Sequence, residues 1–185
     1  MSDVKKELAK YGKLLHDKDM VIGSGGNISV KSGKSVTIKK RSVDMSSGGV
    51  SGYISFLPKD LRKHEAVLST ETPFHIACYA ARPDVKAIVH VHSPAIIAAG
   101  EKTRMLYKVS YEFEYVINSR VPVIPYIQPG STALARVLAK EIKSGANAVI
   151  MKKHGAISVG KTLEEAYLRM LALERGAEVF LWSAL

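Results

Sequence analysis

Ala87-Ile88-Val89-His90-Val91-His92 is the stretch from which the fold of this 185-residue sequence can be worked out. A short apolar run of this kind predicts a β-strand. Side chains two positions apart in a strand point to the same face, so the imidazoles of His90 and His92 should share one space, with Ile88 packing near them. Two neutral imidazoles held in this way are half of a zinc site, although two histidines on the solvent side of a half-buried strand would show the same spacing.

Helical and strand patterns alternate along the rest of the sequence. The expected helices cover Val4 to a point before Gly23, about 71–82, 93–100, 131–143, and the region from a capping box of Thr162 and Glu165 to about Trp182. The expected strands cover 28–31, 35–38, 53–56, 87–92, 123–127 and 148–151. Because hairpins are mixed with helices, we expect a three-layer α/β fold, with a mixed and mainly antiparallel central sheet and helices on both faces.

Length and composition fit one domain. A chain of 185 residues with 46% apolar residues can bury a sizeable core, and no linker or repeat divides it, so we expect a single domain over 1–185. The first residues lack the apolar region of a signal peptide, and no apolar stretch is long enough to span a bilayer. The sequence therefore predicts a cytoplasmic protein with no membrane partner.

The net charge of +10 indicates an anionic partner or a solvated basic surface. The basic residues cluster at Lys31, Lys34, Lys39, Lys40 and Arg41, and again at Lys152 and Lys153. Stacking aromatic residues, which a surface for single-stranded nucleic acid would need, are not interleaved with them. Nucleic acid is therefore not the expected partner, and most of these side chains are expected to face solvent.

Further candidate metal ligands lie elsewhere in the sequence. His154 is followed by Gly155 at the end of an apolar strand, where glycine permits a sharp turn. Glu71 is expected at the start of a helix, a position that favours the charged form of a carboxylate. His75 lies one helical turn further on and could compete as a ligand, but a packed or supporting role is the better interpretation.

Two segments could hold an anion. Gly23-Ser24-Gly25-Gly26-Asn27 is a run of small residues whose backbone amides can converge, with side-chain donors on Ser24 and Asn27. Ser69 and Thr70 precede the helix that starts near Glu71, with Thr70 as its expected N-cap, and they add hydroxyl groups and helix-start amides suited to phosphate. The glycine pattern alone is also typical of an ordinary tight turn.

Five short motifs are more specific together than any one of them alone. They are Gly-Ser-Gly-Gly-Asn-Ile-Ser at 23–29, Leu-Ser-Thr-Glu-Thr-Pro-Phe-His at 68–75, Ala-Arg-Pro-Asp-Val at 81–85, His-Val-His-Ser at 90–93 and Lys-His-Gly at 153–155. In this combination and order, which spans nearly the whole chain, the sequence resembles the class II aldolase/adducin family. Within the family it is most similar to the aldolases that act on fuculose 1-phosphate.

The resemblance implies a metal site beside a phosphate pocket. One Zn²⁺ per subunit would be bound by four side chains, those of Glu71, His90, His92 and His154. The phosphate would be held by Gly26, Asn27, Ser69 and Thr70. The family usually has a Thr-Pro-Ser-Gly turn where this chain has Lys39-Lys40-Arg41-Ser42, so Arg41 and Ser42 are the substrate-binding residues expected at that departure.

The resemblance also implies an assembly, a homotetramer with active sites at subunit interfaces. A tyrosine from the neighbouring subunit would complete each site, and in this sequence that tyrosine is Tyr111. The implied reaction is the reversible cleavage of a short ketose 1-phosphate into dihydroxyacetone phosphate and an aldehyde such as lactaldehyde. Cleavage leaves an enediolate whose negative charge zinc can stabilise, while Glu71 moves a proton at carbon and Tyr111 at the aldehyde oxygen.

Other functions on the same scaffold are a pentulose-5-phosphate 4-epimerase, a methylthioribulose-1-phosphate dehydratase and a non-catalytic adducin-like binding module. Epimerases of the family tend to carry aspartate where Glu71 stands, which favours an aldolase. Non-catalytic members lack the full set of metal ligands, whereas all four positions carry competent residues in this sequence.

Overall fold

The computed structural model describes residues 2–183 and contains, within them, one eight-stranded sheet. Its strands are β1 (Asn27–Ser32), β2 (Ser35–Lys39), β3 (Tyr53–Phe56), β4 (Ala87–Val91), β5 (Met105–Leu106), β6 (Val121–Ile124), β7 (Ala148–Met151) and β8 (Gly155–Gly160). They follow the order β3-β2-β1-β4-β8-β7-β6-β5, and every neighbouring pair is antiparallel except β6 and β7. The mixed and mainly antiparallel sheet that the hairpins predicted is confirmed.

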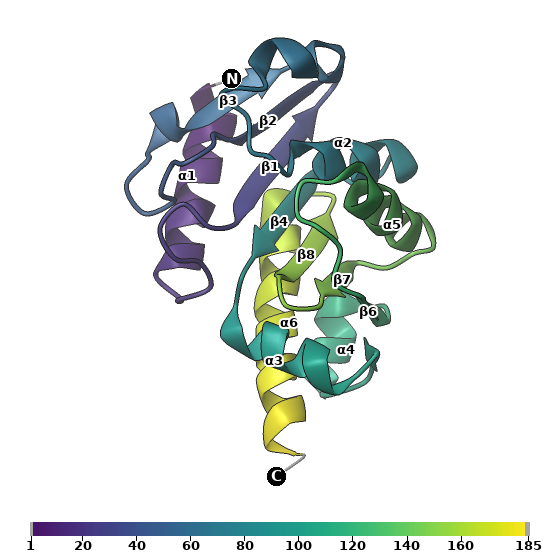
Figure 1. Ribbon diagram of the computed structural model, residues 1–185. Helices are drawn as coiled ribbons and strands as arrows, with labels where there is room; N and C mark the ends of the chain where they lie inside the picture. Colours follow the sequence, from purple (N-terminus) through teal and green to yellow (C-terminus); the bar gives the residue numbers. More distant parts are fainter. Residues whose placement is uncertain (1, 184–185) are drawn as a thin grey trace.

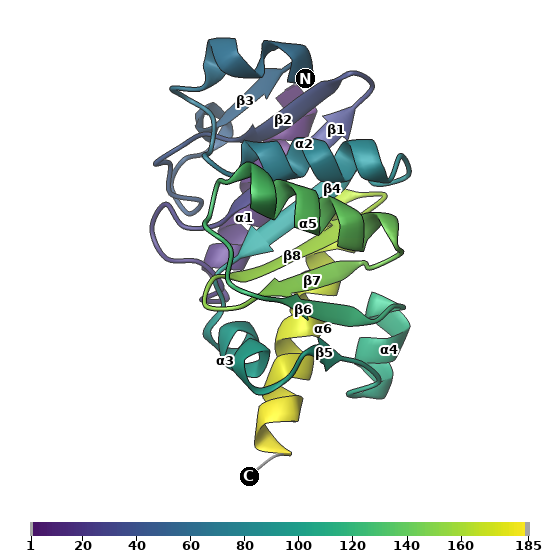
Figure 2. The ribbon, with the colours of Figure 1, turned by 45° about the vertical axis from the view of Figure 1, so that its right-hand side comes forward.

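Helices cover both faces of the sheet, which confirms the predicted three layers (Figures 1 and 2). One face carries α1 (Ser2–His16), α3 (Pro94–Lys102), α4 (Tyr111–Ile117) and α6 (Leu163–Trp182), and the other carries α2 (Thr72–Ala81) and α5 (Thr132–Lys143). Each face has its own apolar core, and each fully buried Leu or Ile side chain stabilises the fold by about 2 kcal/mol. Two short 3₁₀-helices, η1 (Val50–Gly52) and η2 (Pro58–His64), flank β3.

Strand β4 lies in the middle of the sheet, between β1 and β8. All five of its residues are buried, with Val89 in the core under α6 and Ile88 in the core under α2 and α5. His90 follows Ile88 at the period of two, and its side chain has no solvent exposure. The alternative of two histidines on the wet side of a half-buried strand is therefore wrong.

Several predicted boundaries differ from the structure. The strand expected over 123–127 is β6, which ends at Ile124 because Pro125 has no N–H to continue a ladder. Thr70 is not the N-cap of α2, since Glu71 occupies that position without a side-chain cap bond. Thr72 instead closes this turn, because its hydroxyl donates to the carbonyl oxygen of Ser69 at 2.7 Å.

Strands β5 and β8 and helix α4 had no prediction. Strand β8 pairs with both β4 and β7, although its two glycines and one serine weaken its strand pattern. Helix α4 is only seven residues long, and the hydroxyl of Ser110 caps it by accepting from the N–H of Phe113 at 3.1 Å. Among the helices of residues 2–183, none has the length and apolar content needed to cross a membrane.

Candidate metal centre

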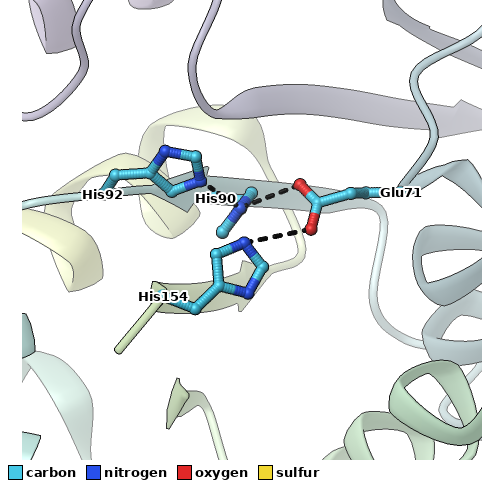
Figure 3. A group of neighbouring side chains, drawn as sticks. All are labelled: Glu71, His90, His92 and His154. Carbon is cyan, nitrogen blue, oxygen red and sulfur yellow. Dashed lines mark hydrogen bonds and ion pairs between the residues drawn. The ribbon is translucent and has the colours of Figure 1, made fainter. Parts of the chain in front are cut away.

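Four side chains from three parts of the chain converge beside β4 (Figure 3). Glu71 stands at the start of α2, His90 and His92 come from the end of β4, and His154 comes from the turn between β7 and β8. One nitrogen or oxygen atom from each of these side chains lies within 4.8 Å of the others. The structure therefore brings together all four residues that the family resemblance implied as metal ligands.

Glu71 uses both of its carboxylate oxygens in this group. Its Oε2 lies 2.9 Å from Nε2 of His90, and its Oε1 lies 3.2 Å from Nε2 of His154. Nε2 of His92 lies 2.9 Å from Nε2 of His90 on the other side. The nitrogens of the three imidazoles and the carboxylate oxygens thus face one common point.

Burial and mutual contact shift the pKa values within this group. Burial alone would raise the pKa of the Glu71 carboxyl, but the charge and hydrogen bonds of His90 and His154 outweigh it and hold this pKa well below its ordinary value. Burial would lower the pKa of His90, but Glu71 outweighs it and raises this pKa. Burial lowers the pKa of His92 to about 3, with His90 and His154 acting in the same direction. A proton between Glu71 and His90 thus neutralises the negative charge of the carboxylate when no metal ion does so.

The donor set fits a divalent transition metal. Three imidazole nitrogens and one carboxylate are ligands that zinc takes in tetrahedral sites. Nδ1 of His90 donates to the carbonyl oxygen of Ala156 at 2.9 Å, which turns the Nε2 lone pair toward the group. Oε1 of Glu71 is buried and, within residues 2–183, faces Nε2 of His154 at 3.2 Å, so both atoms can serve the same cation. The two facing Nε2 atoms of His90 and His92 need a proton or a cation between them, since two lone pairs repel.

Two glycines let the backbone deliver these side chains. Gly26 has a φ of +61°, and a Cβ there would lie 2.6 Å from the carbonyl oxygen of His90, so only glycine lets this loop pack against β4. Gly155 has a φ of +148° and follows His154, which in turn follows Lys153 with a φ of +58°. These two positive values form the tight turn that directs His154 back toward β4.

Asn27 connects this group to the residues expected to bind phosphate. It is the first residue of β1, pairs with His90 across the two strands and is buried. Its Nδ2 donates to Oε2 of Glu71 at 2.9 Å and to Oγ of Ser69 at 3.3 Å. His75, left open as a competing ligand, contacts Asn27 and Ser29 from its two ring nitrogens and lies outside the four-residue group.

A cavity of about 430 Å³ includes in its lining the two residues that precede Glu71, Ser69 and Thr70, but none of the four converging side chains. Polar groups of Arg41, Ser69 and Thr70 line it together with the backbone of Gly130. Nε of Arg41 donates to the carbonyl oxygen of Leu68 at 3.1 Å, which fixes its guanidinium at the cavity edge. The residues that line it also include Leu61, Arg62, Glu65, Leu68, Pro73 and Pro129, but not Gly26, Asn27 or Ser42. Of the expected substrate-binding residues, three therefore share this cavity and three lie outside its lining.

Lys39 corrects one expectation. It was expected to belong to a solvated basic face, but only 2% of its surface is exposed. Its ammonium donates to the carbonyl oxygens of Ser24 and Val43, both at 2.7 Å, so it joins the glycine loop to the segment after β2. Burial lowers the pKa of Lys39 to about 8, although Asp44 and Glu71 act against that shift. The one sequence signal for an unusual role of Lys39 was that residues 39–42 differ from the turn that the family usually has there.

Tyr111 lies away from the four-residue group. It is the first residue of α4, its side chain is 85% exposed, and its ring stacks on Tyr115 with 6.2 Å between centroids. Figure 2 shows α4 at the β5 and β6 end of the sheet, whereas the histidines come from β4 and the turn before β8. Tyr111 therefore does not join the four-residue group within one chain, and its role across a subunit interface stays a prediction.

Fold and site together define an α/β protein with a Glu and three His side chains arranged for a metal at the centre of a mixed sheet. Residues 6–181 match the Class II Aldolase and Adducin N-terminal domain, and the chain belongs to this family. The resemblance seen in the five sequence motifs is therefore confirmed.

The chain is similar to named aldolases and to a named decarboxylase. Aldolases are lyases. L-fuculose phosphate aldolase of Methanocaldococcus jannaschii is 27% identical over 186 residues, which cover 98% of this chain and 97% of the relative. 3-oxo-tetronate 4-phosphate decarboxylase of Haemophilus influenzae is 28% identical over 95% of this chain and 86% of the relative. The crystal structure of l-fuculose-1-phosphate aldolase from Thermus thermophilus has a TM-score of 0.87 and 21% identity, covering 100% of this chain and 95% of that one, and shows the shared fold.

Proposed function

We propose that this chain is a zinc-dependent aldolase that reversibly cleaves a short ketose 1-phosphate, similar to L-fuculose 1-phosphate, into dihydroxyacetone phosphate and an aldehyde. The observation that carries the proposal is the convergence of four side chains, those of Glu71, His90, His92 and His154. Ser69 and Thr70, which precede Glu71, line a cavity together with Arg41. Relatives named L-fuculose phosphate aldolase, similar over nearly their whole length, support the substrate class. We also propose a cytoplasmic homo-oligomer, expected to be a tetramer.

The carbon–carbon bond in such a substrate lies beta to a carbonyl, so its cleavage places negative charge on the ketone oxygen and the neighbouring hydroxyl oxygen. A zinc ion held by the three histidines would supply Lewis-acid stabilisation of that charge. Burial lowers the pKa of His92 to about 3, so this imidazole is a neutral ligand, and Nε2 of His90 becomes one once a cation replaces the proton that His90 shares with Glu71.

Glu71 would act on the proton of the reacting carbon. Its carboxylate is held in the charged form, and Asn27 orients it through a hydrogen bond of 2.9 Å. A carboxylate in this position can accept the proton from dihydroxyacetone phosphate in synthesis and return it to the enediolate in cleavage. Tyr111 of a neighbouring subunit would exchange the proton on the aldehyde oxygen.

The phosphate would lie in the cavity beside Ser69 and Thr70. Their hydroxyl groups and the backbone amides at the start of α2 are suited to phosphate oxygens, and the guanidinium of Arg41 at the cavity edge adds a positive charge. Gly26, Asn27 and Ser42 do not line the cavity, and we propose them as substrate-binding residues on the family resemblance alone. This placement puts the phosphate end of the substrate beside the carboxylate that acts on its carbon chain.

A panel of phosphorylated ketoses, assayed for release of dihydroxyacetone phosphate, tests this proposal. Fuculose 1-phosphate and 5-deoxypentulose 1-phosphates should be cleaved by the zinc-loaded protein, and a chelator should abolish the release. Metal analysis of the purified protein should give about one zinc per chain, as expected for one tetrahedral site. A protein that takes up no stoichiometric metal would instead resemble a non-catalytic binding module.

A second candidate reaction is decarboxylation of a phosphorylated 3-oxo acid, favoured by the relative in Haemophilus influenzae. Loss of carbon dioxide from such an acid also leaves an enediolate, so the same site could stabilise it. Measuring carbon dioxide and triose release from matched substrates separates the two candidates.

A further inference from the structure

A row of buried polar side chains continues from Glu71 into the space between α2 and β1. The Nδ2 atom of Asn27 donates to Glu71, and Oδ1 of the same amide contacts Nε2 of His75. Nδ1 of His75 lies 2.7 Å from the hydroxyl of Ser29, which lies 2.7 Å from the hydroxyl of Tyr79. All five side chains are buried, so their hydrogen bonds cannot be exchanged with bulk water.

The direction of each hydrogen bond in this row follows from the charge on Glu71. A carboxylate only accepts, so the NH₂ side of Asn27 must face it and the oxygen of the amide must face His75. Nε2 of His75 must then carry the hydrogen. A neutral imidazole has only one N–H, so its Nδ1 accepts from Ser29. The hydroxyl of Tyr79 is then a donor, with Oγ of Ser29 at 2.7 Å and the carbonyl oxygen of Ser29 at 3.0 Å as its acceptors.

The surroundings of His75 favour this neutral form. Its side chain has no solvent exposure, and burial lowers its pKa to about 3, with His90 acting in the same direction and Glu71 against it. The opposite tautomer would leave Oδ1 of Asn27 facing an acceptor, and the amide would have to turn its oxygen toward Glu71. Two acceptors would then face each other in a buried space, which is unfavourable.

We propose that His75 is a positioning residue, whose Nε2–H locks the Asn27 amide so that it donates to Glu71 and fixes this carboxylate at the metal centre. The inference rests on the proposed role of Glu71 as metal ligand and proton carrier. The ring nitrogens of His75 contact Ser29 and Asn27 and none of the four candidate ligands, so its effect passes through Asn27.

Zinc affinity, measured by competition with a chromogenic chelator, tests the proposal without any sugar substrate. His75→Gln places an N–H donor near the position of Nε2, whereas His75→Asn places its amide near Nδ1 and leaves Asn27 without a donor. We expect His75→Asn to bind zinc ~10–100-fold more weakly than the wild type and His75→Gln to recover most of the loss. Tyr79→Phe is the matched control, because it leaves the bond between Ser29 and His75 intact, and it should bind zinc like the wild type.

Thermal unfolding of each variant shows whether it is folded before its zinc affinity is compared. Nitrogen NMR of the wild-type protein labelled at histidine gives a second readout that needs no variant, and it should show His75 as the neutral Nε2–H tautomer at about pH 7, well above its lowered pKa. A His75→Asn protein with wild-type zinc affinity, or a His75 that is charged or carries its hydrogen on Nδ1, would overturn the proposal. Failure of the aldolase proposal would be seen separately, as a lack of triose release by the wild type.

Discussion

A Cβ atom on Gly155 would lie 2.0 Å from the carbonyl oxygen of Val91, so the turn that carries His154 is pressed directly against the end of β4. We expect Gly155→Ala to lower the free energy of unfolding by about 2–4 kcal/mol, because a backbone clash and a positive φ act together. Gly145→Ala is the control, since Gly145 also has a positive φ, of +102°, but nothing lies within 4 Å of its Cβ position. Denaturant unfolding should show a clearly smaller loss for the control, and equal losses would contradict the close packing.

Glu71→Gln should reduce turnover by about two to four orders of magnitude, because an amide cannot move the proton at the enediolate carbon. Phosphate affinity should change little, since Ser69, Thr70 and Arg41 are untouched. Steady-state kinetics with the best ketose phosphate, alongside a binding titration with inorganic phosphate, measure both effects. Unchanged turnover would refute the assignment of Glu71.

Arg41→Ala should weaken the binding of inorganic phosphate by about tenfold, because one charge-assisted contact is lost at the cavity edge. Lys34→Ala removes one positive charge from the exposed turn between β1 and β2 and serves as the control for a change in net charge. Isothermal titration should separate the two variants, and equal affinities would place the phosphate away from Arg41.

Mixing two inactive variants tests whether Tyr111 acts across a subunit interface. Glu71→Gln and Tyr111→Phe should each be slow alone, but mixed oligomers should regain activity at sites that combine an intact Glu71 with a neighbour's intact Tyr111. Random exchange of equal amounts should restore about a quarter of wild-type activity if each site draws on two subunits. Absence of any recovery after subunit exchange has been demonstrated would place both residues in one chain or remove Tyr111 from the reaction.

The lowered pKa of the buried Lys39 ammonium predicts how the stability of the protein depends on pH. Its pKa is about 8 in the folded protein and near the ordinary value of 10.5 in the unfolded chain, so the unfolded state holds more protons between these two values. Stability relative to a Lys39→Met variant should therefore rise as the pH increases from about 8 to about 10.5, by about 3 kcal/mol, and stay flat at lower pH. Urea unfolding of both proteins across this range measures the difference, and a constant difference would contradict the burial of a charged ammonium.

Local pattern was sufficient to predict the elements that give the fold its shape. The strand of His90, the hairpin of β1 and β2 and the helices α2, α5 and α6 all have a clear period or a cap signal. Strand β8 and helix α4 could not be predicted in this way, because the first contains small residues whose burial depends on its neighbours and the second is shorter than the span over which a helical period can be recognised.

The candidate site also has features that the sequence predicts and features that it does not predict. Spacing alone paired His90 with His92, but only the resemblance to a family joined them to Glu71 and His154, since nothing local indicates which turns meet in space. The burial of Lys39 and the contacts of His75 were not predictable, because they depend on carbonyl and amide groups that other segments bring to them.

The four convergent side chains come from the start of α2, from the end of β4 and from the turn before β8. An ion bound there would cross-link segments that are far apart in the chain. The unfolded polypeptide has no such site, and a ligand present at about a thousand times its Kd stabilises the folded state by about 4 kcal/mol. The melting temperature of this protein should therefore report which divalent ions it accepts, and rank them, before any sugar has been tried.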